Sequence, residues 1–172
     1  LPSIVLVTGY ALGVGMLIGW IFVTTGMSDR GWVISIFGLL GIAAILLHYR
    51  TFRVPFSMFI AGLFGLVVVF DITSMLVPLG WDQIDQDNFF DLRQGGSIAI
   101  TTFVFGLLSF AVAIWFDMRD SHRVGRMARS AFWLHLLAAP ALTNTVLMTA
   151  YNVQGAQGML LTVIGLLLIT LF

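Results

Sequence analysis

A few polar side chains inside otherwise apolar segments are the residues best placed for chemistry. Asp71 interrupts the apolar run 55–79, and His135, Thr143 and Asn144 lie in the run 131–151. A carboxylate at the centre of a membrane helix costs about 2.5–3.5 kcal/mol on insertion scales, so such groups face protein or water. We therefore treat Asp71, His135, Thr143 and Asn144 as a candidate intramembrane polar site.

Asp71 has two interpretations. As a functional group it would relay a proton or a cation; as a structural group it would accept hydrogen bonds from Thr73, Ser74 or a neighbouring helix. At the rise of an α-helix it lies roughly 24 Å beyond Pro55, in the outer third of its span, where insertion costs less. We expect Asp71 and Asn144 to face one bundle interior, with a polar partner or water within reach of Asp71.

Pro140 predicts a kink in the run 131–151, because it removes a backbone donor and frees the carbonyl of Leu136. The kink could serve packing alone, or it could form the broken helix that transporters use. Haem ligation by His135 would need a second histidine nearby, but His48 and His122 lie in predicted loops. We expect no cofactor.

Membrane-spanning helices must position these residues. Of the 172 residues, 59% are hydrophobic and 9% charged, against about 25% charged in soluble domains, and the mean hydropathy is +1.03. The fold class predicted is an all-α polytopic transmembrane helical bundle in one domain, 1–172, without the alternation of membrane strands. Five complete spans and a sixth that is cut off are expected at 4–25, 32–47, 55–79, 97–116, 131–151 and 158–172.

Several function classes are disfavoured. Eight Arg balance eight Asp, and the sequence has no Lys, Glu or Cys. Without Cys there is no disulfide or thiolate metal site, and the neutral charge argues against a nucleic-acid partner. No nucleophile–base pair, phosphate-binding loop or HExxH spacing occurs, so an enzyme is the least favoured class and we expect no metal site.

The arginines predict the orientation. The loops after the second and fourth spans hold six of them, which places these loops and the N-terminus in the cytoplasm: Arg50, Arg53, Arg119, Arg123, Arg126 and Arg129, against Arg30 and Arg93 on the other side. The spacing from Arg119 to Arg129 would align four guanidinium groups along one side of a helix. Facing anionic headgroups, each contributes about 1 kcal/mol; a dedicated lipid or protein partner is the alternative.

The loop 80–93 carries most of the acid on the opposite side. Its carboxylates miss the register of an EF-hand loop and no Glu closes it. We expect a solvated acidic loop with Phe89 and Phe90 at the bilayer surface, and a cation site is the alternative. The acidic residues are Asp82, Asp85, Asp87 and Asp91.

The first span carries four glycines in two pairs, Gly9 with Gly13 and Gly15 with Gly19. Small residues four apart let helix backbones approach closely. The pattern predicts an interface helix whose partner is the second span, another copy of the chain or another membrane protein.

Two hairpins of the sequence look alike. The tetrapeptides 37–40 and 105–108 both read Phe-Gly-Leu-Leu, and an offset of 73 sets Asp71 on Asn144. Either two-helix units repeat in parallel, or abundant Gly and Leu match by chance. A related tetrapeptide at 164–167 would start a third unit. We therefore expect a longer protein that continues past Phe172 for about seven apolar residues before an Arg-bearing turn.

The stretch Trp115–Asp120, followed by Ala131–Pro140 (WFDMRD, then AFWLHLLAAP), resembles uncharacterised bacterial multi-pass inner-membrane proteins. The likeness covers about 25 residues. It implies a polytopic protein of the bacterial inner membrane and supplies no activity.

Sparse polarity within the spans favours a non-enzymatic scaffold or accessory subunit that acts through helix–helix and lipid contacts. The alternative is a transporter or channel for an ion or small solute, centred on Asp71 and the helix break from Pro140 to Asn144. The two readings differ on whether Asp71, His135 and Asn144 converge on a wet cavity.

Overall fold

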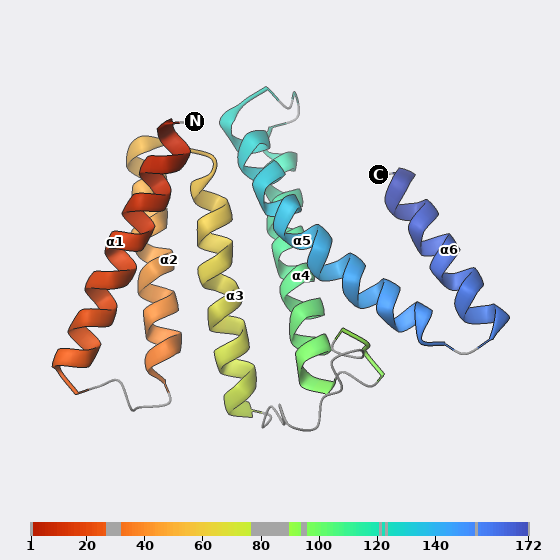
Figure 1. Cartoon of the computed structure of the whole chain (residues 1–172). Helices are drawn as coiled ribbons and strands as arrows, with labels where there is room; N and C mark the ends of the chain where they lie inside the picture. Colours follow the sequence, from red (N-terminus) through yellow and green to blue (C-terminus); the bar gives the residue numbers. More distant parts are fainter. Residues whose placement is uncertain are drawn as a thin grey trace.

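Every regular element in the described part of the chain is an α-helix (Figure 1). The computed structural model describes residues 2–26, 32–76, 90–93, 96–120, 122, 124–153 and 155–171. The helices are α1 (Pro2–Thr24), α2 (Val33–Phe52), α3 (Ser57–Leu76), α4 (Gly96–Met118), α5 (Arg126–Tyr151) and α6 (Ala156–Leu171).

Five of these helices, α1 to α5, are long and apolar enough to cross a membrane, and α6 has 16 residues. The predicted all-α membrane-spanning bundle is thereby confirmed. Large apolar side chains are freely exposed on its outer faces, with Met16 at 74% and Leu76 at 77%. In a membrane such faces meet acyl chains, so the bundle needs no thick apolar core of its own.

The helix ends differ from the predicted spans because helices continue beyond their charge-free runs. α2 extends past residue 47 to Phe52, so His48 lies in a helix and not in a loop. α5 begins at Arg126 and not at Ala131. Long charged side chains can reach the interface from a helical backbone, so a charge marks the membrane boundary without ending the helix. The loop residues 80–89 and Arg30 lie outside the described residues.

Two helix pairs form the main packing units. α2 packs along α3, and α4 packs along α5; α3 also contacts both α4 and α5 and so joins the pairs. α1 lies against α2, and α6 contacts α5 beyond the second pair (Figure 1). The two turns within these pairs lie at the same end, which we call the arginine-rich end after Arg50, Arg53, Arg119, Arg126 and Arg129.

Close packing within and between the pairs depends on glycines of α2, α3 and α4. A Cβ added at Gly38 would lie 2.4 Å from Val68 Cγ2, and one at Gly41 would lie 2.5 Å from the Phe64 ring. Gly62 accommodates Leu137 and Gly106 accommodates Leu142 in the same way. Small residues are the means by which membrane helices approach each other.

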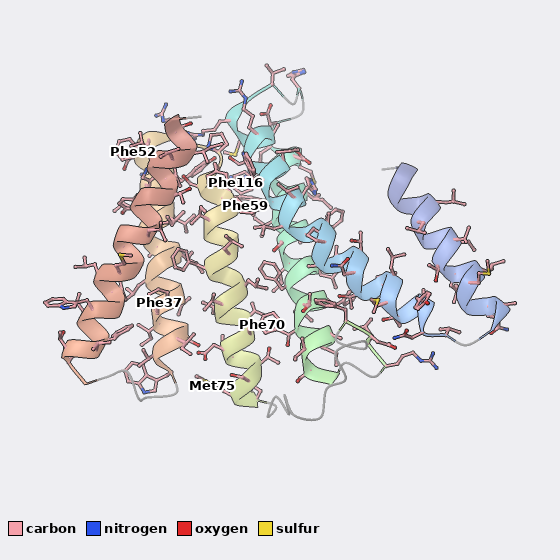
Figure 2. All side chains as sticks on the ribbon, viewed as in Figure 1. Phe37, Phe52, Phe59, Phe70, Met75 and Phe116 are labelled. Carbon is pink, nitrogen blue, oxygen red and sulfur yellow. The ribbon has the colours of Figure 1, made fainter. Side chains whose placement is uncertain are left out.

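Aromatic side chains fill the space between the pairs toward the arginine-rich end. Figure 2 labels Phe59 and Phe116 in this region; Phe116 belongs to a buried apolar cluster, and partly buried Phe59 packs against another one. The Phe56 and Phe59 rings of α3 meet the Trp133 ring of α5 with centroid distances of 4.8 and 5.8 Å. This contact fixes the second pair against the first.

The two pairs bury corresponding faces, as the predicted repeat requires. Each buried residue of α2, moved by 68 positions, falls on a buried residue of α4. The matched positions are Val33 with Thr101, Gly38 with Gly106, Gly41 with Ser109, Ile45 with Ala113 and His48 with Phe116. With the offset of 73, Ser57 and Met58 of α3 match buried Ser130 and Ala131 of α5, but later positions do not match.

Candidate functional site

Asp71 is buried in α3, with 9% of its surface exposed. One carboxylate oxygen, Oδ2, accepts a hydrogen bond from Ser35 Oγ of α2 at 2.5 Å. The hydroxyls of Thr73 and Ser74 donate instead to the backbone carbonyls of Val69 and Asp71. Asp71 therefore has the polar partner expected for it, from a neighbouring helix and not from its own.

Asn144 does not share an interior with Asp71, and this prediction is wrong. Its side chain is exposed, Thr143 is half-buried, and the next residue, Thr145, is fully buried and donates to the Ala141 carbonyl. The offset that equated Asn144 with Asp71 passes through Pro140, which lies inside α5. A proline bends a helix and changes which residues face a neighbour further along.

His135 of α5 forms a pair with Asp117 of α4. His135 Nε2 lies 3.0 Å from Asp117 Oδ2, and the two side chains are 34% and 24% exposed. The Phe110 ring packs edge-on against the imidazole with a centroid distance of 5.4 Å. Since Asp117 is the penultimate residue of α4, this pair lies toward the arginine-rich end.

The polar residues predicted to form one intramembrane site are thus held in three places. When α5 is aligned with α3 by the offset of 73, His135 takes the position of Gly62. Gly62 precedes Asp71 by nine residues, which is roughly 13 Å along a helix. Asp71 is bonded to α2, His135 is bonded to α4, and Asn144 faces outward. They do not converge.

The arginines do not lie along one helix face, because a turn separates them: α4 ends at Met118 and α5 begins at Arg126. The Arg119 guanidinium lies 3.8 Å from the centre of the Trp115 ring, and that of Arg126 lies 5.1 Å from the Tyr49 ring. Arg123 lies outside the described residues. The guanidinium groups near this turn therefore point to different surroundings.

The strongest candidate site is a pocket of about 350 Å³ between the end of α4 and the start of α5. It is lined by Asp117, Ala128, Arg129, Phe132 and His135. Residues that carry a carboxylate, a guanidinium and an imidazole thus line one pocket together with an exposed aromatic residue. This set can bind a ligand that carries both a cation and an anion, through charge-assisted hydrogen bonds.

Asp120 fixes the wall of this pocket. Its Oδ2 accepts from the Ala128 backbone N–H at 3.3 Å and so caps the first turn of α5, where Gly125 has no side chain to do so. A Cβ on Gly125 would lie 2.3 Å from the same oxygen. The negative charge also offsets Arg126 and Arg129, which are unfavourable at a helix N-terminus.

Sequence reasoning found His135 and Arg129 separately and missed Asp117 as a partner. It also missed two hydroxyl contacts at the arginine-rich end. His48 Nδ1 lies 3.3 Å from Ser57 Oγ, and Tyr49 OH lies 3.0 Å from Ser130 Oγ. The two serines occupy equivalent positions at the offset of 73, which is the one signal that could have drawn attention to them.

The glycines of α1 are mostly unused within the chain. A Cβ at Gly9, Gly13 or Gly19 would meet nothing within 4 Å, and one at Gly15 would lie 3.6 Å from Phe37. α1 instead docks through buried Val7 and Ala11, which belong to an apolar cluster with Ile45. Of the three possible partners of these glycines, the second span is contacted only at Gly15.

Comparison with models of protein families, with curated proteins and with solved structures finds no match to this chain. Its function is therefore inferred from its own contacts. Among the described residues, every buried side-chain nitrogen or oxygen has a hydrogen-bond partner. The buried polar groups of these residues are thus committed to contacts inside the chain.

Proposed function

We propose that this chain is a non-enzymatic scaffold or accessory subunit of a membrane, which acts through helix–helix and lipid contacts. The observation that supports this most is that Asp71, His135 and Asn144 do not converge. A relay needs several polar groups along one path, and here each group is held apart from the others.

The polar contacts act as links between helices. Ser35 and Asp71 join α2 to α3, Tyr49 and Ser130 join α2 to α5, and Asp117 and His135 join α4 to α5. Hydrogen bonds between membrane helices contribute about 0.6 kcal/mol on average and up to about 1.7 kcal/mol. Together with the glycine contacts they favour a rigid body that presents fixed outer faces to partners.

The alternative, a transporter or channel for an ion or small solute, draws support from one observation. Pro140 lies inside α5, and Asn144 one turn beyond it is exposed, so a polar group follows the proline on the outer face of the chain. A second membrane subunit covering this face would place Asn144 in an interior.

Ion flux and cross-linking distinguish the two. Wild-type protein and Asp71→Asn are reconstituted in liposomes and tested for proton, sodium and potassium flux. A scaffold gives the same flux as protein-free liposomes in both. For cross-linking in native membranes, a photoreactive residue replaces either exposed Leu12 of α1 or exposed Ile100 of α4. We expect a discrete protein adduct from only one of these two positions, because a partner subunit covers one face and lipid covers the other. Flux that Asp71→Asn abolishes would replace the scaffold by the transporter.

We further propose that the membrane is the bacterial inner membrane, with the arginine-rich end and the N-terminus in the cytoplasm. The arginine distribution supports this orientation. Since the sequence has no cysteine, single cysteines at Val124 and Thr25 report on the two ends without background. A membrane-impermeant maleimide added to intact cells should label Thr25→Cys and spare Val124→Cys; the reverse pattern would invert the orientation.

A further inference from the structure

We propose that the pocket formed by Asp117, Arg129, Phe132 and His135 is a selective site for the headgroup of phosphatidylethanolamine. This inference rests on the lipid contacts of the proposed function and makes one of them specific. It concerns only the junction of α4 and α5, so it can fail while the contacts between helices stand.

The charges of the pocket match those of this headgroup. The Asp117 carboxylate, already held by His135 at 3.0 Å, presents its oxygens to a ligand ammonium. Arg129 lines the same pocket, and a guanidinium binds phosphate oxygens in bidentate geometry. A primary ammonium next to a phosphate can therefore satisfy both residues at once.

The surroundings of the pocket favour a lipid over a soluble ligand. Phe132 lines it and is 60% exposed, and Leu136, one turn further along α5, is 47% exposed. Phe110 of α4 is 40% exposed and packs against His135. These side chains continue from the pocket along spans that face acyl chains. A pocket of about 350 Å³ is at the small end of ligand sites, a size suited to a headgroup whose chains remain outside.

The pocket also favours one class of phospholipid over others. The phosphate is common to these lipids, but a phosphatidylglycerol headgroup offers the Asp117 carboxylate no cation to offset it. The trimethylammonium of phosphatidylcholine has no N–H to donate to the carboxylate. A nonspecific attraction of the arginines for anionic lipid would instead favour phosphatidylglycerol and would weaken with salt. The lipid that is preferred therefore distinguishes specific binding in the pocket from nonspecific binding to surface arginines.

The experiment measures quenching of the native tryptophan fluorescence by brominated lipids in nanodiscs that contain the full chain. Trp115 and Trp133 are near neighbours in sequence of Asp117 and Phe132. Brominated phosphatidylethanolamine, phosphatidylglycerol and phosphatidylcholine are compared in a background of unlabelled phosphatidylcholine. For the wild type we expect phosphatidylethanolamine to occupy the site about five- to tenfold more strongly than either other lipid, a ratio within the range of the net contribution of one ordinary hydrogen bond.

Three variants test the assignment of the groups. Asp117→Asn should abolish the preference for phosphatidylethanolamine over phosphatidylcholine, and Arg129→Gln should weaken the binding of all three lipids. Arg53→Gln removes one positive charge from the same end, outside the pocket lining. It should change neither the preference for phosphatidylethanolamine nor the overall strength of lipid binding. If Asp117→Asn does not fold, Arg129→Gln still tests the proposal, because it should weaken lipid binding while Arg53→Gln should not.

Wild-type protein without a preference for phosphatidylethanolamine would overturn the proposal. So would a preference for phosphatidylglycerol that falls equally with Arg53→Gln and Arg129→Gln, because that pattern reports surface charge alone. Neither result would alter the flux and cross-linking outcomes on which the scaffold function depends.

Discussion

Replacing Gly38 by alanine tests whether glycine contacts hold the first helix pair together. The added Cβ would lie 2.4 Å from Val68 Cγ2 and 3.2 Å from the Phe64 carbonyl oxygen. Carbon atoms in contact are normally at least about 3.5 Å apart, so the Val68 methyl would have to retreat by about 1.1 Å. Val68 is β-branched and nearly fixed at χ1 in a helix, and the carbonyl is backbone, so α3 itself must move.

The magnitude follows from a matched pair of variants. Overpacking of this kind costs about 1–3 kcal/mol, while Gly→Ala in a helix gains about 0.8–1.0 kcal/mol of propensity. Gly13→Ala in α1 gains the same propensity and meets nothing within 4 Å. The difference in unfolding free energy between Gly38→Ala and Gly13→Ala therefore isolates the contact, and we expect Gly38→Ala to be less stable by about 1–3 kcal/mol.

Unfolding in mixed micelles by titration with SDS, followed by tryptophan fluorescence, measures this difference. Adding Val68→Ala removes the methyl group that the new Cβ meets, so the double variant should show a favourable coupling of about 1 kcal/mol. Equal stability of Gly38→Ala and Gly13→Ala would refute the close approach of α2 and α3. A large loss in Gly13→Ala instead would show that α1 has a partner outside this chain.

Four further substitutions are each measured in the same unfolding assay. Ser35→Ala leaves the Asp71 carboxylate without its donor and should cost about 1–3 kcal/mol, whereas Asp71→Asn keeps an acceptor and should cost less; the opposite order would remove the Ser35 link. Asp120→Ala should cost about 0.5–2 kcal/mol by uncapping α5, and no loss would show that the cap is dispensable. Arg53 ends α2 with φ of 58°, so Arg53→Gly should gain up to about 1 kcal/mol; a loss would mean that its side chain, not its backbone, stabilises the turn.

The spans were predictable because hydropathy is a property of the local sequence. All five complete helices lie where charge-free runs predicted them, since a membrane helix must satisfy its backbone internally and present apolar side chains. The ends of the helices were not predictable, because residues such as Arg126 and His48 can continue a helix into the membrane interface. Charge therefore locates the bilayer surface better than it locates the end of a helix.

Contacts within the candidate site were predictable only where the free-energy cost of an unpaired polar group requires a partner. The cost of an unpaired carboxylate in a membrane required a partner for Asp71, but nothing in the sequence selects Ser35, 36 residues away, over another hydroxyl. The pairing of His135 with Asp117 depends likewise on how α4 and α5 are aligned across their turn. Side-chain pairing between helices is a property of register, which hydropathy does not encode.

The failure at Asn144 has a structural consequence beyond one residue. The buried residues of α2 all match buried residues of α4, and α3 and α5 begin alike at Ser57 and Ser130. In Figure 1 the end of α5 that leads to α6 lies away from α3, and the counterpart of buried Asp71, Asn144, is exposed. That departure brings the far half of α5 to α6, which packs against it and forms with it a second pocket of about 630 Å³, lined in part by Tyr151 and Met159. The likeness between the two hairpins therefore ends within α5, and the end of α5 that lines this pocket with α6 lies beyond that point.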